Sequence, residues 1–367
     1  PQFNLDVSAS SSFDNTFSAL FGGEFSIPSR QGARVADLSL TQALYTWGKV
    51  GAAIRAAKAG FGVADDQLRL YQQAVVRDVS TEFYNVLLAK ELNAIAIENL
   101  KQRERHLEEA RRKYAVGMAT DYDVLAGQVA QKNAQPAVIR TENLIRLARE
   151  RLRFLLAVDR EEVDAEGTLE TTIEPYTAFE EALAVALMNR PELSDLTHRL
   201  GISRELVKIA NAGDKPRLDF DGHAGLRSFG VGPFTASGET WSAAITLSFP
   251  FFDGFKARGK VQQAQSDLMS LQIEKDKTKD SIALQVRDAL NLVRENGEIV
   301  TGLRGTVSEA ERLLWMAEKG FELGAKTRLE VDDAQSNVIQ AKGNLATGLR
   351  DYLAAKVALA WAQGTIK

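Results

Sequence analysis

The sequence predicts a mixed fold in which pairs of β-strands lead into very long α-helices, with this unit present twice in one chain. Three observations predict it. The chain matches itself at a constant offset, several stretches alternate apolar and other residues with a period of two, and a long proline-free stretch keeps a heptad pattern. At 367 residues the chain is long enough to bury a sizeable core.

Composition narrows the class of protein. The net charge of -4, from 45 basic and 49 acidic residues, provides no broad basic surface, so nucleic acid is not an expected partner. The absence of cysteine excludes disulfides, thiolate metal sites and a cysteine nucleophile. No stretch of 18 apolar residues occurs, which leaves soluble proteins and β-barrels. The chain starts at Pro1 without an initiator Met, so we expect a processed or trimmed start.

The duplication runs without a gap from about Leu40 to about Asp159, where position n resembles position n+207. Chance similarity between two alanine-rich helices is the alternative, and the gapless match of the glycines argues against it. The identical pairs include Leu40 and Leu247, Lys49 and Lys256, Val79 and Val286, Gly117 and Gly324, Thr120 and Thr327, Val124 and Val331, and Gln128 and Gln335.

Each repeat begins with a strand pair, at residues 1–42 of the first repeat (1–159) and 216–250 of the second (216–367). We expect loops at Asp14 to Gly32 and at Ser228 to Gly238. Four alternating strands suit a membrane barrel, but they are too few to close one, so several chains would have to contribute. Ordinary hairpins on a soluble core are the alternative. The alternating apolar set comprises Phe3, Leu5, Val7, Leu38, Leu40, Leu218, Phe220, Leu226, Trp241, Ile245 and Leu247.

A long helix follows each strand pair, at about 48–115 and about 255–322. In the first, Gly60 and Gly62 mark either a bend or a tolerated flaw. The helices reverse at tips 114–122 and 321–329 and continue as descending helices at about 121–158 and about 328–362. Pro136 and Gly343 predict a kink or break in each descending helix. Residues 160–215 comprise an acidic connector and a further helical stretch from Phe179 to about Asn211. The heptad seam is Val50, Ile54, Ala57, Phe61, Ala64, Leu68, Tyr71 and Val75.

These features in this order resemble the TolC-type outer membrane efflux family, over essentially the whole chain. The motifs are the strand-to-helix junctions at 38–45 and 247–254, the two glycine tips, and the stretch from Glu181 to Leu193 that includes Asn189-Arg190-Pro191-Glu192-Leu193. The family has a second copy of that last helix before the first strand pair. Because this chain starts at a strand, we expect the native protein to extend upstream, with a signal peptide and another helix.

The resemblance implies a homotrimer in the outer membrane of a Gram-negative bacterium, with a large periplasmic part. Four strands from each subunit would form a 12-stranded barrel in lipid, continued by a coiled-coil tunnel of α-helices. The implied partners are a periplasmic adaptor (membrane fusion) protein and an inner membrane transporter. The implied function is passive conduction in a tripartite efflux pump or a type I secretion system, gated at the helix tips, and the residues do not choose between drugs and proteins as cargo.

The two tips differ in charge. The first carries Asp121 and Asp123, and the second carries Lys326 and Arg328, so a narrow end would bring opposite charges together as a latch. An exposed pair contributes only about 0 to 1 kcal/mol, so such a latch has to be a threefold network. By resemblance, Asp123 and Lys326 match gate-holding polar positions of the family. Its aromatic tip positions are Tyr114 and Phe321, and Phe321 lacks the hydroxyl that the family often has.

Glu330 and Asp333 are three residues apart on one helical face, and three copies would form two stacked acidic rings that favour cations. A solvated helix face is the alternative. Adaptor docking is expected at the tip residues Gly117, Thr120, Gly324 and Thr327, which are also ordinary turn residues.

Catalysis finds no support. The three histidines, His106, His198 and His223, are scattered, and we expect His106 and His223 to be solvated. The sequence shows no metal spacing, phosphate loop or nucleophile elbow, so no enzyme activity, metal or cofactor is expected. The alternative to a duct is a periplasmic coiled-coil structural or adaptor protein.

Overall fold

The computed structural model describes residues 2–14, 29–158, 162–231 and 234–366. The described part forms two compact units, Pro1–Val63 with Leu196–Ile273 (unit 1) and Ala64–Asp195 with Glu274–Lys367 (unit 2). Each unit therefore takes segments from both sequence repeats, because strands pack with strands and long helices with long helices. The two repeats remain a prediction about the sequence, and the compact units divide the chain differently.

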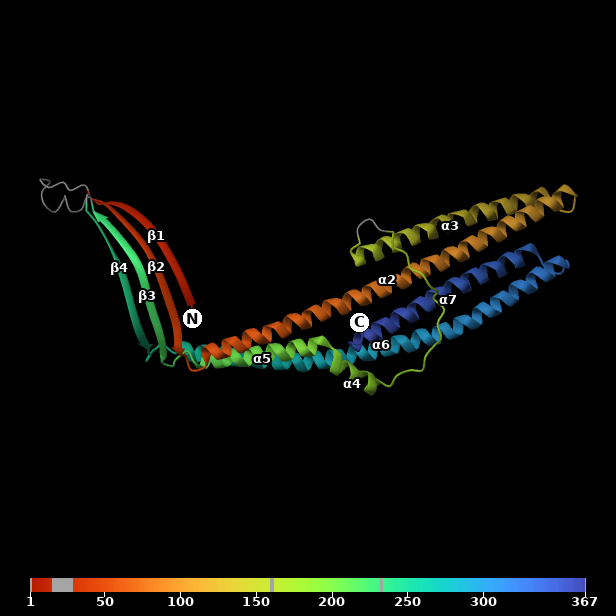
Figure 1. Ribbon diagram of the computed structural model, residues 1–367. Coiled ribbons are helices and arrows are strands. Elements are labelled where there is room, and N and C mark those ends of the chain that lie inside the picture. Colours follow the sequence, from red (N-terminus) through yellow and green to blue (C-terminus); the bar gives the residue numbers. More distant parts are fainter. Residues whose placement is uncertain (1, 15–28, 159–161, 232–233, 367) are drawn as a thin grey trace. The chain divides into compact units, whose positions relative to one another are not determined.

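Unit 1 contains one antiparallel sheet of four strands in the order β1-β2-β3-β4 (Figure 1). The strands are β1 Gln2–Asp14, β2 Ser29–Tyr45, β3 Arg217–Val231 and β4 Phe234–Ser248. The loop predicted at Ser228 to Gly238 is wrong over most of its length, because β3 and β4 stay paired up to Val231 and Phe234. Gly230 pairs with Thr235, and Ser228 with Ser237, within this stretch. Of the loop predicted at Asp14 to Gly32, residues 15–28 lie outside the described residues, and β2 already begins at Ser29.

The register sorts the sheet into an apolar and a polar face. Leu5, Leu38, Ala224 and Trp241 form one row across the four strands, and the next row on the opposite face contains Asp6 and Asp37. The apolar face is exposed in the isolated chain, where Leu5 is 70% and Trp241 82% accessible. On β3 this face runs over nine residues, from Leu218 to Leu226, which matches the 9 to 11 residues of a transmembrane β-strand.

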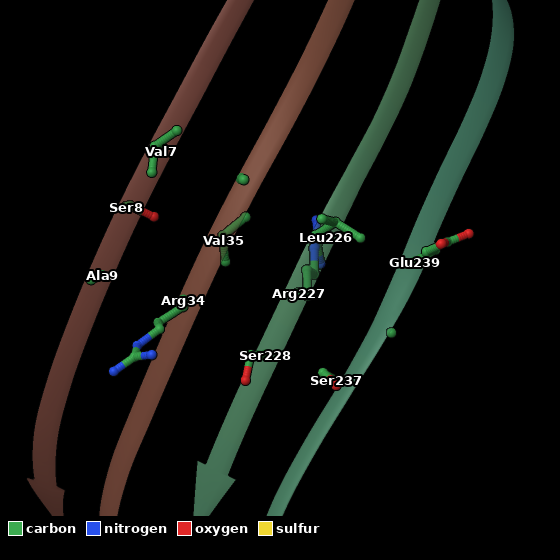
Figure 2. A pocket seen from close by; sticks show the side chains of 12 residues that line it. Val7, Ser8, Ala9, Arg34, Val35, Leu226, Arg227, Ser228, Ser237 and Glu239 are labelled. Atoms are coloured by element: carbon green, nitrogen blue, oxygen red, sulfur yellow. The ribbon is translucent and has the colours of Figure 1, made fainter.

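Polar side chains replace apolar ones where this face ends. Arg34, Ser228 and Ser237 share one row, and Glu239 lies opposite Leu226. Figure 2 shows these residues around a shallow hollow of about 590 Å³ that crosses all four strands. The apolar band of the sheet is therefore bounded by residues that suit an interface with water.

The strand-to-helix junctions of unit 1 share an unusual backbone. Trp47 and Gly48 have φ values of 53° and 80°, and Gly254 and Phe255, at the equivalent positions, have 65° and 64°. A left-handed conformation is strained for an aromatic residue, so contacts have to hold it. The indole Nε1 of Trp47 donates a hydrogen bond to the carbonyl oxygen of Pro216 at 2.8 Å, and the Phe255 ring packs edge-on against that of Phe252.

The helices follow the predicted order with one additional break. They are α2 Lys49–Ala115, α3 Asp121–Leu156, α4 Phe179–Asn189, α5 Pro191–Asn211, α6 Lys256–Glu322 and α7 Arg328–Ala362. The single stretch predicted from Phe179 divides at Arg190, whose ψ of 119° is extended because Pro191 disfavours a helical residue before it. A kink or break was predicted at Pro136 and at Gly343; a break is wrong at both, since α3 and α7 each continue through them, and a kink stays a prediction. None of the described helices carries an apolar stretch long enough to span a membrane.

In unit 2, α2 lies antiparallel to α3 and α6 to α7 (Figure 1). The largest core cluster joins both pairs through the connector, because Ala165 and Leu169 are buried with Val86, Val300 and Tyr352. Ion pairs fix the connector at its start, where Asp164 binds both Lys90 and Arg149 at 2.8 Å. A segment that the sequence predicts only as a linker therefore fills the space between the two helical pairs.

The two glycines near the start of α2 have different surroundings. A Cβ atom at Gly62 would lie 2.7 Å from the His198 ring of α5, whereas a Cβ at Gly60 would meet no described atom within 4 Å. Gly62 therefore permits the close approach of α5, and position 60 has room for a larger side chain.

We expect Gly60→Ala to stabilise the protein by up to ~1 kcal/mol, since alanine favours the helix. We expect Gly62→Ala to destabilise it, since the His198 ring has to move. Thermal unfolding followed by circular dichroism in detergent would measure both as opposite shifts in Tm. Equal stabilisation by the two substitutions would contradict the packing role of Gly62.

Candidate functional site: the helix tips

The two helix tips lie at the same end of unit 2 (Figure 1). At each tip a glycine with φ of 74° ends the incoming helix. The N–H of Gly117 donates to the Tyr114 carbonyl at 2.9 Å, and the N–H of Gly324 donates to the Phe321 carbonyl at 3.0 Å. A left-handed backbone favours glycine, which explains why glycine occupies this position at both tips.

A capping box begins each outgoing helix. The Thr120 hydroxyl oxygen accepts from the Asp123 N–H at 3.3 Å, and the Asp123 carboxylate accepts from the Thr120 N–H at 2.8 Å. Thr327 and Glu330 form the same pair of bonds at 3.3 and 2.8 Å. The bonds from Thr120 lower the pKa of Asp123. Asp123 therefore has a local role in holding the start of α3.

Lys326 lies in the turn before α7 and reaches the first turn of that helix. Its ammonium group forms an ion pair with Glu330, and this contact, with the hydrogen bonds from Thr327, lowers the pKa of Glu330 to about 2. The stem of Lys326 crosses Gly320, where a Cβ atom would lie 2.4 Å from Lys326 Cγ. Sequence reasoning missed Gly320, which leaves room for this side chain.

The remaining predicted residues have varied surroundings. Tyr114 is half exposed, whereas Phe321 packs beside Ala317 and Val331 with the Lys113 ammonium 5.5 Å from its ring centre. Arg328 approaches Asp332 at 3.5 Å. Among the described residues of this one chain, no ion pair joins Asp121 or Asp123 to Lys326 or Arg328, and neither Asp121 nor Asp333 has an ion-pair partner. The predicted latch is not formed within a single chain, and it stays a prediction for contacts between subunits.

Two polar residues near the tips, Arg103 and Asp332, were missed by the sequence reasoning. Arg103 of α2 forms an ion pair with Asp332 of α7, and His106 lies one turn further along α2. Comparing the two repeats could have found these residues, because Arg103 and Asp332 correspond to the apolar Ala310 and Leu125 at the offset of 207.

Burial, together with the positive charge of Arg328, lowers the pKa of His106 to about 4. The remaining charged neighbours are Arg103 and Glu109 of α2 and Asp332 of α7. His106 is thus partly buried and neutral at pH 7, not solvated as expected. No group of three or more His, Asp or Glu in the described part of the chain could hold a metal ion.

This shift predicts a pH dependence. Because the folded pKa is below the unfolded value of about 6.5, the unfolded chain binds more protons, so the stabilisation is present above pH 6.5 and is lost as the pH falls towards 4. We expect the free energy of unfolding of His106→Gln to fall less between pH 7 and pH 4.5 than that of the wild type, by on the order of 1 kcal/mol. Comparing the Tm of both proteins at pH 7 and pH 4.5 would measure it, and identical changes in Tm would contradict the burial of a neutral imidazole.

Known proteins share both the sequence pattern and the fold. The TolC outer membrane protein of Escherichia coli is 23% identical, over 91% of this chain and 70% of the relative. The alkaline protease secretion protein AprF of Pseudomonas aeruginosa is 24% identical, over 94% and 72%. The open state of the MtrE outer membrane channel of Neisseria gonorrhoeae has a TM-score of 0.79 at 17% identity, over 100% and 81%.

The channel CmeC of Campylobacter jejuni has the same TM-score at 16% identity, over 99% of this chain and 77% of its own. These structures confirm the predicted fold class of barrel strands continued by long helices. The sequence model described as "Outer membrane efflux protein" matches residues 1–158 and 182–365. The chain therefore belongs to the outer membrane efflux protein family, as the resemblance predicted.

Proposed function

We propose that this chain is one subunit of a homotrimeric outer membrane duct that conducts substrates without chemical change. The observation that carries the proposal is the four-stranded sheet, which has an exposed apolar face and two unpaired edges, β1 and β4. Lipid tolerates no unpaired strand edge, so the sheet has to join others in a closed barrel. Three such sheets make a 12-stranded barrel, and α2 and α6 continue two of the four strands into the tunnel wall.

The partners of the duct are a periplasmic adaptor and an inner membrane transporter, which meet it at the helix tips. The tips suit a docking surface because Val116, Met118 and Leu323 are apolar side chains that are 70%, 78% and 84% exposed. Gly117, Thr120, Gly324 and Thr327 fix the backbone that presents them. AprF is named for the secretion of a protease, which supports a protein as the exported cargo, and a small molecule is the alternative.

The gate lies where the acidic residues at the start of α7 face their copies in the other subunits. Within one chain Lys326 neutralises Glu330, and Asp333 has no ion-pair partner among the described residues. Asp121 or Asp123 of a neighbouring subunit would compete with Glu330 for Lys326. Each exposed contact contributes about 0 to 1 kcal/mol, so a docking partner can break the network.

The membrane assignment has a direct test. We expect the protein to fractionate with outer membranes, to require detergent and to give a trimer on chemical cross-linking, because the apolar sheet face and its edges cannot remain in water. A water-soluble monomer would instead support a periplasmic coiled-coil structural or adaptor protein.

The gate has a separate test. We expect Asp123→Ala combined with Lys326→Ala to raise the single-channel conductance in a planar bilayer, because both sides of the latch are removed. The matched control is Lys319→Ala with Glu322→Ala, which removes an exposed pair of 2.7 Å at the end of α6. Unchanged conductance in the first double variant, or an equal rise in the control, would exclude the latch.

A further inference from the structure

We propose that Arg103 is a positioning residue that holds the start of α7 against α2 through Asp332. The inference rests on the proposed function in one respect, since it takes the start of α7 as part of the gate. Asp332 lies between Glu330 and Asp333, the two residues expected to face the pore. Whatever holds Asp332 therefore also sets the position of both acidic side chains.

The contact involves a shared carboxylate. Arg103 Nη1 donates to one oxygen of Asp332, and Arg328 Nε approaches the other oxygen at 3.5 Å. The Arg103 side chain is only 13% exposed, and its ion-pair partner in the described structure is Asp332. A guanidinium that is largely removed from water depends on such a partner. One carboxylate therefore compensates two cations from two helices.

The start of α7 has apolar contacts with α6. Val331 and Ala334 of α7 are buried against Ala317 and Phe321 of α6. The ion pair of Arg103 joins this part of α7 to α2, 229 positions away in the sequence. The start of α7 thus has an apolar attachment to one helix and an ionic attachment to the other.

The first repeat has no equivalent attachment among the described residues. Leu125 of α3 corresponds to Asp332 and is 57% exposed, and Ala310 of α6 corresponds to Arg103. The start of α3 has its capping box and lacks an acidic residue at this position. The two tips therefore differ in how their outgoing helices are fixed. In the part of the chain that the structure describes, the ion pair to α2 is found at the start of α7 and not at the start of α3.

The shared carboxylate predicts an asymmetry between two substitutions. In Asp332→Asn, the largely buried Arg103 loses its partner and faces Arg328 across the gap, so two cations repel each other. In Arg103→Met, Asp332 keeps its ion pair with Arg328, four residues earlier on the same helix. The methionine side chain takes the place of the apolar stem of Arg103. Asp332→Asn should therefore loosen the start of α7 more than Arg103→Met does, and Arg103→Lys should restore part of the contact.

Hydrogen exchange of the detergent-solubilised channel, read by mass spectrometry over residues 328–336, tests this order. We expect exchange to rise about tenfold in Asp332→Asn and less in Arg103→Met, with the start of α3 unchanged. The matched control is Lys342→Met, which breaks the 2.8 Å pair of α7 with Glu311 of α6 and should leave residues 328–336 unchanged. Wild-type exchange in Asp332→Asn, or an equal rise in the control, would overturn the positioning role.

Single-channel conductance of the same variants separates this inference from the gate. Faster exchange with higher conductance supports both. Faster exchange with unchanged conductance supports the positioning of α7 by Arg103 and overturns the assignment of the gate to this helix. Unchanged exchange overturns the positioning role at any conductance.

Discussion

The hydrogen-bonding requirement of a sheet in lipid is the constraint on which the rest of this protein depends. Four strands leave one edge of β1 and one of β4 without partners, and water cannot satisfy these groups inside a bilayer. Association of several sheets removes both edges at once. The same association places the polar face, with Asp6, Asp37 and His223, around a common interior, so one backbone requirement provides both the lipid contact and the aqueous path.

Unit 2 is subject to a different constraint: its long antiparallel helices have to pack closely over most of their length. Its buried positions are largely alanines and small aliphatic residues, such as Ala89, Ala148, Ala310 and Ala341. Small side chains let helix backbones approach, but each contributes little apolar area. The connector supplements this small core by burying Ala165 and Leu169 in the cluster that contains Tyr352, while its acidic side chains stay exposed.

The elements were largely predictable from the sequence, and the contacts were not. Period-two alternation found all four strands, and glycine and threonine located the ends of the long helices at Gly117 and Thr120. The alternation was too faint to show that β3 and β4 pair through their glycine-rich ends. The sequence showed which tip residues are charged, but not their partners, because polar groups nearby in the sequence compete for each charged side chain. Asp123 bonds Thr120 and Lys326 bonds Glu330, each within four residues. Arg103 and Asp332 meet only because the fold brings α2 and α7 together.

The junctions in unit 1 show what the duplication has kept. Both copies turn from strand to helix through two successive left-handed residues, yet the aromatic residue comes first in Trp47-Gly48 and second in Gly254-Phe255. Two copies aligned by residue type would score this dipeptide as a mismatch at both positions. At these junctions the internal symmetry is therefore one of main-chain torsion angles, within which the ring has moved by one residue and still packs edge-on against the equivalent aromatic residue, Tyr45 in the first copy and Phe252 in the second.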